Sequence, residues 1–173
     1  MRARPSPHNA EYQAFLGGSY VEVGRFGDAI PPLEAALRID PRSASAHNDL
    51  GTALLSLGRR SEALAHLERA ALLAPRDERM YFNLGNALRE SSRFDEAGRA
   101  YLHALAINPD FPDAHVNLGT LLFSRGRLAE ALPHFQRAVE LEPESAVIHN
   151  DFAGVLAAGA IPRRCATSSA RSR

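Results

Sequence analysis

Residues 81–109, YFNLGNALRESSRFDEAGRAYLHALAINP, contain a pattern that recurs along the chain and indicates how the chain folds. The pair Leu84-Gly85 returns at a step of 34 residues, and two alanines and a proline return in the same phase. The recurring positions are Leu16-Gly17, Leu50-Gly51, Leu84-Gly85 and Leu118-Gly119; Ala29, Ala63, Ala97 and Ala131; Ala36, Ala70, Ala104 and Ala138; and Pro41, Pro75, Pro109 and Pro143. Agreement at several positions indicates a helical repeat protein whose units stack on one another.

Each repeat predicts two helices. The first runs, for example, from about Ala44 to Leu57, because Leu50, Leu54 and Leu57 recur three and four residues apart. Residues suited to the first turn precede or open these helices: Asn9, Ser43, Asp77, Ser145 and Pro112. The second helices are expected to start near Ser61 or Asp95 in their repeats, since both residue types cap helices well.

Small residues predict where the two helices of a repeat touch. Gly51 and Ala63 would let the backbones approach closely, with Leu67 filling the space beside them. The break between the helices is expected at Gly24, Gly58, Ser92 and Gly126. Pro31, Pro32 and Pro133 fall in the expected first turns of second helices and predict that these helices start late or loosely.

Composition narrows the classes of partner. The chain has 20 basic and 20 acidic residues and a net charge near zero, which argues against nucleic acid and an anionic membrane. All the basic residues are arginine, so Schiff-base chemistry by lysine is excluded. The single cysteine, Cys165, excludes an intramolecular disulfide. Without a signal peptide or an apolar span, we expect a cytoplasmic protein.

With these residues in place, the chain resembles the tetratricopeptide repeat (TPR) family over roughly residues 10–159. The resemblance implies an all-α, right-handed solenoid of antiparallel helix hairpins, with about four and a half repeats and roughly nine helices. It implies a disordered tail at 1–9, repeats at 10–43, 44–77, 78–111 and 112–145, a half repeat at 146–159, and a disordered or irregular tail at 160–173. The expected function is a scaffold that binds a peptide or partner protein on its concave surface.

In this family the first helices line the groove, and the resemblance assigns candidate peptide-binding residues. One strip is Asp49, Asn83, Asn117 and Asp151, and a second is Thr52, Asn86 and Thr120; Asn48, Arg79, Phe82 and Arg89 flank them. The repeats are similar to those of O-linked N-acetylglucosamine transferases, which hold peptides with an asparagine ladder. Only Asn83 and Asn117 match that ladder, because aspartates replace it at Asp49 and Asp151 and Phe15 departs from it. The alternative function is therefore the substrate-recognition part of a larger enzyme, such as a glycosyltransferase.

The last half repeat is mostly apolar, with a stripe of Ile148, Phe152, Val155 and Leu156. It is either an unfinished repeat, from truncation or a frame shift, or a cap. An unfinished repeat would leave an apolar side that favours self-association.

Two further sets of residues invite a functional interpretation. The histidines His47, His115 and His149 share one position of the repeat, while His66, His103 and His134 lie on second helices. Packing distances separate the histidines, so we predict that they serve interhelix packing or lie on a solvated helix face, and that they form no metal, cofactor or catalytic site. Four arginines, Arg25, Arg59, Arg93 and Arg127, follow the turns. They would either satisfy helix-end carbonyls, which we favour, or form a ridge for an acidic partner.

Overall fold

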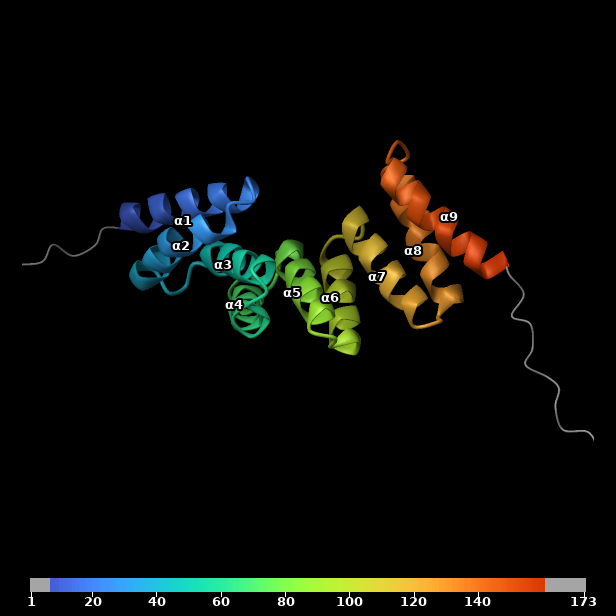
Figure 1. The fold of residues 1–173 in the computed structure, drawn as a ribbon, viewed down its shortest axis with the longest axis horizontal. Coiled ribbons are helices and arrows are strands. Elements are labelled where there is room, and N and C mark those ends of the chain that lie inside the picture. The colour runs from blue at the N-terminus through green and yellow to red at the C-terminus, as the bar shows by residue number, and fades with distance from the viewer. Residues whose placement is uncertain (1–6, 161–173) are drawn as a thin grey trace, which may run out of the picture. The chain divides into compact units, whose positions relative to one another are not determined.

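The computed structural model describes residues 7–160, and this part of the chain consists of nine α-helices without a β-strand (Figure 1). The helices are α1 (Pro7–Glu22), α2 (Phe26–Ile39), α3 (Ala44–Ser56), α4 (Arg60–Leu73), α5 (Glu78–Glu90), α6 (Phe94–Ile107), α7 (Pro112–Ser124), α8 (Leu128–Leu141) and α9 (Ala146–Ala160). The predicted all-α solenoid of helix hairpins is confirmed.

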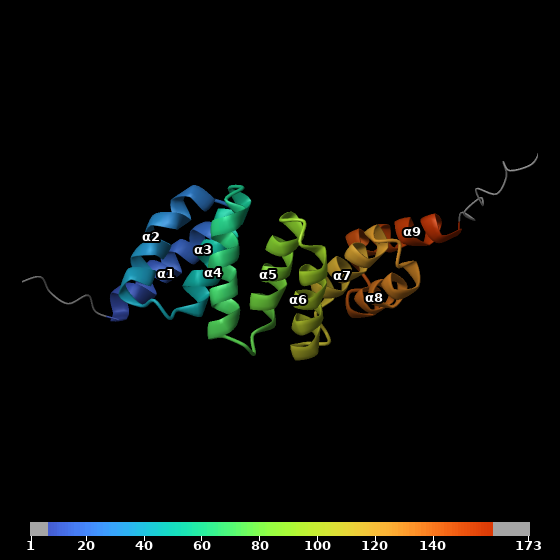
Figure 2. The same ribbon diagram turned by 90° about the horizontal axis from the view of Figure 1, so that it is seen from below.

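The helices belong to two compact units, the first ending at Ala114 and the second beginning at His115. In the first unit α1 packs on α2, α3 on α4 and α5 on α6, while α2 contacts α3 and α4 contacts α5 (Figure 2). The first helices also touch, α1 against α3 and α3 against α5. In the second unit α8 packs against α9. First helices of successive repeats in the first unit are therefore neighbours, which gathers their side chains on one face.

The core of each hairpin consists of the recurring alanines and one large side chain. Every recurring alanine that the sequence singled out is at most 1% exposed, and so are Leu33, Leu67, Tyr101 and Phe135. A Cβ atom on Gly51 would lie 2.6 Å from Leu67 Cγ and 3.2 Å from the Ala63 carbonyl oxygen. The predicted close approach of the two backbones is confirmed, and the large side chain fills the space that the glycine leaves.

The turn between the two helices of a repeat has one geometry throughout. Gly24, Gly58 and Gly126 have φ between 74° and 77°, and Ser92 has φ 59°. The residue after each of them donates its backbone N–H to a carbonyl near the end of the first helix, as Arg59 N does to Leu54 O at 2.9 Å. This pattern satisfies carbonyls that the helix end would leave without a partner.

The first helices begin largely as predicted. Ser43 accepts a hydrogen bond from Ala46 N, Asp77 accepts one from Arg79 N, and Pro112 is the first residue of α7. Asn9 is an exception because α1 already starts at Pro7, which places Asn9 inside the helix. A proline fits the first helical position, where its missing N–H has no intrahelical partner.

The second helices start near the predicted residues, but the predicted caps Ser61 and Asp95 were wrong. α4 begins at Arg60 and α6 at Phe94, so Ser61 and Asp95 lie inside the first turn and do not cap. The capping residues are Arg59 and Arg93, whose carbonyls accept from the N–H groups of residues 63 and 97. The turn geometry fixes this start, and an acidic first turn then stabilises the positive end of the helix.

The prolines do not delay their helices either. α2 begins at Phe26 and α8 at Leu128, so Pro31, Pro32 and Pro133 lie beyond the first turn, inside the helices. Each helix starts at its turn, where Ala29 N donates to Arg25 O and Ala131 N to Arg127 O. The second helices therefore tolerate the lost N–H donors.

At the C-terminal end α9 extends to Ala160, and the predicted tail beyond it lies outside the described residues. Ile148 and Val155 are buried, and Phe152 stacks on Phe135 of α8 with ring centroids 6.2 Å apart. Most of the apolar stripe thus packs within the second unit. Across residues 7–160, no helix is both long enough and apolar enough to cross a membrane.

Candidate peptide-binding site

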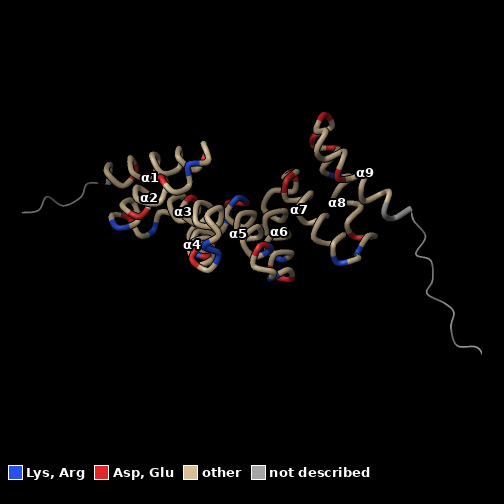
Figure 3. The backbone as a smooth tube through the Cα atoms, in the orientation of Figure 1, with Lys and Arg blue, Asp and Glu red and all other residues tan. Residues whose placement is uncertain are grey.

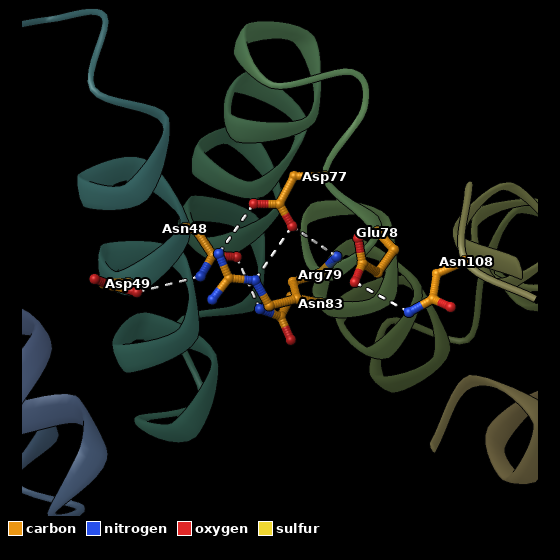
Figure 4. Close-up of polar contacts among 7 residues, drawn as sticks. All are labelled: Asn48, Asp49, Asp77, Glu78, Arg79, Asn83 and Asn108. Atoms are coloured by element: carbon orange, nitrogen blue, oxygen red, sulfur yellow. Dashed lines mark hydrogen bonds and ion pairs between the residues drawn. The ribbon is translucent and has the colours of Figure 1, made fainter. Parts of the chain in front are cut away.

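Two asparagines from successive first helices meet in the first unit. Asn83 Nδ2 on α5 donates to Asn48 Oδ1 on α3 at 2.8 Å, and Asn48 Nδ2 donates to Asp49 Oδ1 at 3.2 Å (Figure 4). All three side chains are half-buried. The repeat geometry brings these residues together across 35 positions of sequence because α3 packs directly on α5. The result is a short polar chain of carboxylate and carboxamide groups.

Asp49 also lies at the edge of a groove between α1, the end of α2 and the start of α3. This groove encloses about 650 Å³. A Cβ atom on Gly18 of α1 would lie 3.0 Å from Asp49 Oδ2, so the glycine lets the carboxylate approach the α1 backbone. Burial raises the pKa of Asp49, while the Asn48 hydrogen bond and the charge of Arg79 partly oppose that rise. A nearby cation would stabilise the ionised form of a carboxylate that is partly removed from water in this way.

Arg79 is tied to the start of its own helix. Its Nε and terminal nitrogen donate to the two oxygens of Asp77 at 3.2 and 3.1 Å, and its backbone N–H donates to Asp77 Oδ1 (Figure 4). The Arg79 hydrogen bond lowers the pKa of Asp77. Asn108 Nδ2 at the end of α6 donates to Glu78 Oε1 at 3.2 Å in the same region. The first turn of α5 is therefore held by polar contacts on both sides.

Three of the candidate residues have structural partners that the sequence did not reveal. Asn86 Oδ1 accepts from the hydroxyl of the fully buried Tyr101 at 2.7 Å. The Phe82 ring packs against Phe111 with centroids 4.9 Å apart, and Thr52 Oγ1 donates to Asn48 O on its own helix. Tyr101, the large residue of the second helix α6, thus reaches Asn86 on the first helix α5. The 15-residue separation of Asn86 and Tyr101 within one repeat is the signal that could have suggested this pair.

The remaining candidates lie elsewhere in the fold. Arg89 is exposed near the end of α5 in the first unit. Asn117 and Thr120 are on α7 and Asp151 is on α9, all in the second unit; Asn117 and Asp151 are half-buried and Thr120 is exposed. Asn48 and Asn83 contact each other through their carboxamide groups. Residue 49, which corresponds to a position of the asparagine ladder, is an aspartate and carries a carboxylate instead.

Histidines form pairs that the sequence reasoning missed. His47 Nδ1 lies 2.9 Å from His66 Nδ1, and His115 Nδ1 lies 3.0 Å from His134 Nδ1. Each pair joins a first helix to the second helix of the same repeat, 19 residues on. In each pair one Nδ1 atom has to donate and the other has to accept. The accepting Nδ1 atom therefore carries no proton, so at least one histidine of each pair is neutral. Burial lowers the pKa of His47 and of His66, and the neighbouring histidine charge lowers the pKa of His66 further.

For Arg25, Arg59 and Arg93, no hydrogen bond from the side chain to a helix-end carbonyl is present among the described residues, so the favoured prediction was wrong for these three. Each guanidinium instead pairs with the acid three residues on, in the first turn of the second helix. The pairs are Arg25–Asp28, Arg59–Glu62, Arg93–Glu96 and Arg127–Glu130, at 2.6 to 2.8 Å, and basic and acidic segments adjoin there in Figure 3. The backbone N–H of the arginine reaches the carbonyl, which leaves the side chain available for the acid. These exposed pairs also neutralise the ridge that an acidic partner would need.

Within the described part of the chain, no group of three or more histidine, cysteine, aspartate and glutamate residues is placed to hold a metal ion. The histidine pairs supply two nitrogens each. What the first-helix face offers is a set of hydrogen-bonding and charged groups beside a groove, an arrangement that suits binding of a chain segment.

Two models of the tetratricopeptide repeat match the sequence, one over residues 20–85 and one over residues 82–146. Together they cover most of the helical region described above. The chain belongs to the tetratricopeptide repeat family. None of the curated proteins matches it.

Solved structures of other TPR proteins share the fold. A structure of PilF from Pseudomonas aeruginosa is 26% identical with a TM-score of 0.81, and the match covers 88% of this chain and 69% of PilF. TTC0263, a thermophilic TPR protein of Thermus thermophilus, is 24% identical with a TM-score of 0.75, covering 86% and 81% of the two chains. A chain of the APC/C hetero-tetramer Cut9–Hcn1 is 18% identical with a TM-score of 0.79, covering 85% of this TPR chain but 30% of that chain.

Proposed function

We propose that this TPR protein is an interaction scaffold that holds an extended segment of a partner protein against its first-helix face. The observation that carries the proposal is the Asn83–Asn48–Asp49 chain of hydrogen bonds across α5 and α3. The family membership supports the general role, since TPR arrays present long surfaces to other proteins. A chain of this fold is also part of the hetero-tetramer named above.

The chemistry of the carboxamides suits a peptide backbone. Each amide side chain carries two N–H donors and an oxygen with two lone pairs. The Asn83–Asn48 bond uses one N–H of Asn83, and the Oδ1 atom of Asn83 accepts no hydrogen bond among the described residues. Asn83 therefore keeps both a donor and an acceptor, the combination that an extended peptide presents in return. Because the pair is already ordered by its mutual bond, binding immobilises little additional side-chain freedom.

A substrate-recognition role within a larger glycosyltransferase-type enzyme stays a prediction. It would use the same first-helix face, and the asparagine ladder that motivates it is limited here to the positions of Asn83 and Asn117. The DNA downstream of this coding sequence tests it, because further repeats followed by a catalytic domain would favour the enzyme.

Self-association through α9 is also a prediction, with a smaller surface than the sequence suggested. Packing on α8 leaves Val147, 71% exposed, and Leu156, 48% exposed, as the large apolar residues that α9 presents to solvent among those described. Sedimentation velocity over a range of concentrations tests this idea. A single monomeric species at high concentration would remove it.

The test of the scaffold function is capture of partners by the purified chain, followed by quantification of the main captured protein. We expect the double variant Asn83→Ala plus Asn117→Ala to lose that protein. A Gln136→Ala variant is the matched control, because Gln136 is an exposed amide on the second helix α8. Circular dichroism must show equal helicity for all three proteins. Undiminished capture by the double variant would move the interface away from the carboxamides.

A further inference from the structure

The groove beside Asp49 has a strong local charge in a chain that is neutral overall. Four carboxylates line it: Glu11 and Glu22 from α1, Asp40 after α2, and Asp49 from α3. No arginine is among the described residues that line it. The chain as a whole balances 20 acids against 20 arginines. The groove thus gathers four carboxylates in the first unit, while no described arginine stands among the residues that line it.

The pairing of arginines elsewhere sharpens this contrast. At every turn between the helices of a repeat, an arginine and an acid form an ion pair within 2.8 Å. In contrast, Glu22, Asp40 and Asp49 form no ion pair with an arginine anywhere in the described residues. Asp40 accepts a backbone N–H from Arg42 at 3.0 Å, and Asp49 accepts the Asn48 amide at 3.2 Å. Their negative charge remains available to a ligand.

Apolar residues line the groove together with these carboxylates. Ala14 and Phe15 from α1 and Ala36 and Ile39 from α2 contribute to the lining. The Phe15 side chain is 74% exposed, an unusual state for an aromatic residue in the middle of a helix. The methylene stem of an arginine or lysine packs well on such a surface while its charged head reaches a carboxylate. An exposed ring additionally attracts a guanidinium over its face.

We propose that the α1–α3 groove binds an extended, arginine- or lysine-rich segment of a partner protein. This inference rests on the proposed scaffold function and names the class of segment that the scaffold holds. The carboxylates supply the attraction for basic side chains, and the neighbouring Asn48–Asn83 pair supplies hydrogen bonds for the backbone of the same segment. A basic segment is also steered to the groove from a distance, because the field of clustered carboxylates speeds encounter at low salt.

The volume of the groove agrees with a segment of chain. About 650 Å³ is in the range of a site for a small ligand or a few amino-acid residues. A metal ion is a poor alternative, since the described residues contain no group of three or more ligands placed around one point. An acidic or neutral segment would bring no positive charge to the half-buried Asp49, so it would gain no attraction from that carboxylate.

The experiment measures fluorescence anisotropy of a labelled short peptide that alternates arginine with alanine, titrated with the full chain. A matched peptide carries glutamine in place of each arginine. We expect the arginine peptide to bind at least about tenfold more tightly, and its affinity to fall as ionic strength rises. The double variant Asp49→Asn plus Glu22→Gln should weaken binding of the arginine peptide by roughly tenfold in total, because Asp49 is half-buried whereas Glu22 is exposed. Asparagine still accepts a hydrogen bond from Asn48, so the fold is expected to persist.

The matched control is Glu34→Gln, which removes one exposed carboxylate of α2 that does not line the groove. This variant should bind the arginine peptide like the unaltered chain. Equal binding of both peptides, or equal losses in the control and the groove variants, would overturn the inference. If neither peptide binds but captured partners still depend on Asn83 and Asn117, the scaffold function stands and the basic-segment inference fails. If neither peptide binds and capture of partners does not depend on Asn83 and Asn117, the proposed scaffold function fails as well.

Discussion

Replacing Gly85 with alanine tests the close packing on which the hairpin depends. A Cβ atom at Gly85 would lie 2.5 Å from Tyr101 Cε1, 2.7 Å from Cδ1 and 3.1 Å from Cζ. The ring cannot turn away freely, because Tyr101 is 0% exposed and its hydroxyl donates to Asn86 Oδ1 at 2.7 Å. To reach an ordinary contact of about 3.4 Å, the ring or the helix has to move by about 0.9 Å.

Two effects of opposite sign set the magnitude. Alanine is favoured over glycine inside a helix by about 1 kcal/mol, which stabilises the variant. Overpacking a buried site costs about 1–3 kcal/mol, and a rigid, hydrogen-bonded ring belongs at the upper end. We therefore expect Gly85→Ala to lose about 2 kcal/mol of unfolding free energy. For a chain of this size, that loss lowers the midpoint of thermal unfolding by about 4–8 °C.

The assay is urea unfolding followed by far-ultraviolet circular dichroism, with Gly154→Ala as the matched control. Gly154 lies inside α9 with nothing within 4 Å of the position that a methyl group would take, so alanine there should raise stability by about 0.5–1 kcal/mol. Gly51→Ala should cost less than Gly85→Ala, because its neighbour Leu67 is a flexible aliphatic side chain. If Gly85→Ala were as stable as the unaltered chain while the control gained stability, the packing argument would be refuted.

Three further predictions concern a turn, a cap and a histidine pair. Ser92→Gly should raise stability by about 1 kcal/mol in urea unfolding, because Ser92 has φ 59° where three other turns use glycine. Ser43→Ala should cost about 1 kcal/mol by the same measurement, since it removes the side-chain acceptor for Ala46 N. The folded pKa values of His47 and His66 lie below their unfolded values, so the unfolded state binds more protons in that interval. The unfolding free energy should therefore fall as the pH drops below the unfolded pKa of about 6.5, and it should level off below the lowered pKa values of the folded state. Replacing both histidines with glutamine should flatten this pH dependence. An unchanged slope in that variant would contradict the prediction.

The candidate site was only partly accessible from the sequence. The repeat phase placed Asn48, Asp49 and Asn83 on first helices correctly, because the 34-residue period fixes the position of a residue within its repeat. The repeat phase did not reveal that Asn86 accepts a hydrogen bond from the Tyr101 hydroxyl. That contact depends on how far the large residue of the second helix reaches across the hairpin, which differs between a leucine and a tyrosine at the same position.

The arginines after the turns show a second limit. Their recurrence is plain in the sequence, but the choice between their two roles depends on the turn geometry. The structure shows that the backbone N–H already serves the helix-end carbonyl, so the Arg59 side chain extends to Glu62 instead. The same turn makes Arg59 the cap of α4, so Ser61, the predicted cap, lies inside the helix. A capping preference is a local tendency of about 1 kcal/mol, and the turn outweighs it.

The helical repeat, its 34-residue period and its recurring buried alanines were predictable from the sequence alone, because they depend on a spacing that every copy of the hairpin must satisfy. The packing of the helices sets which side chains lie together: His47 with His66, Asn48 with Asn83, and the carboxylates of α1 with Asp49 in one groove. These contacts depend on the distance and the rotation between packed helices. Both arise from the volumes of all the side chains between the helices, so no single position of the sequence specifies them.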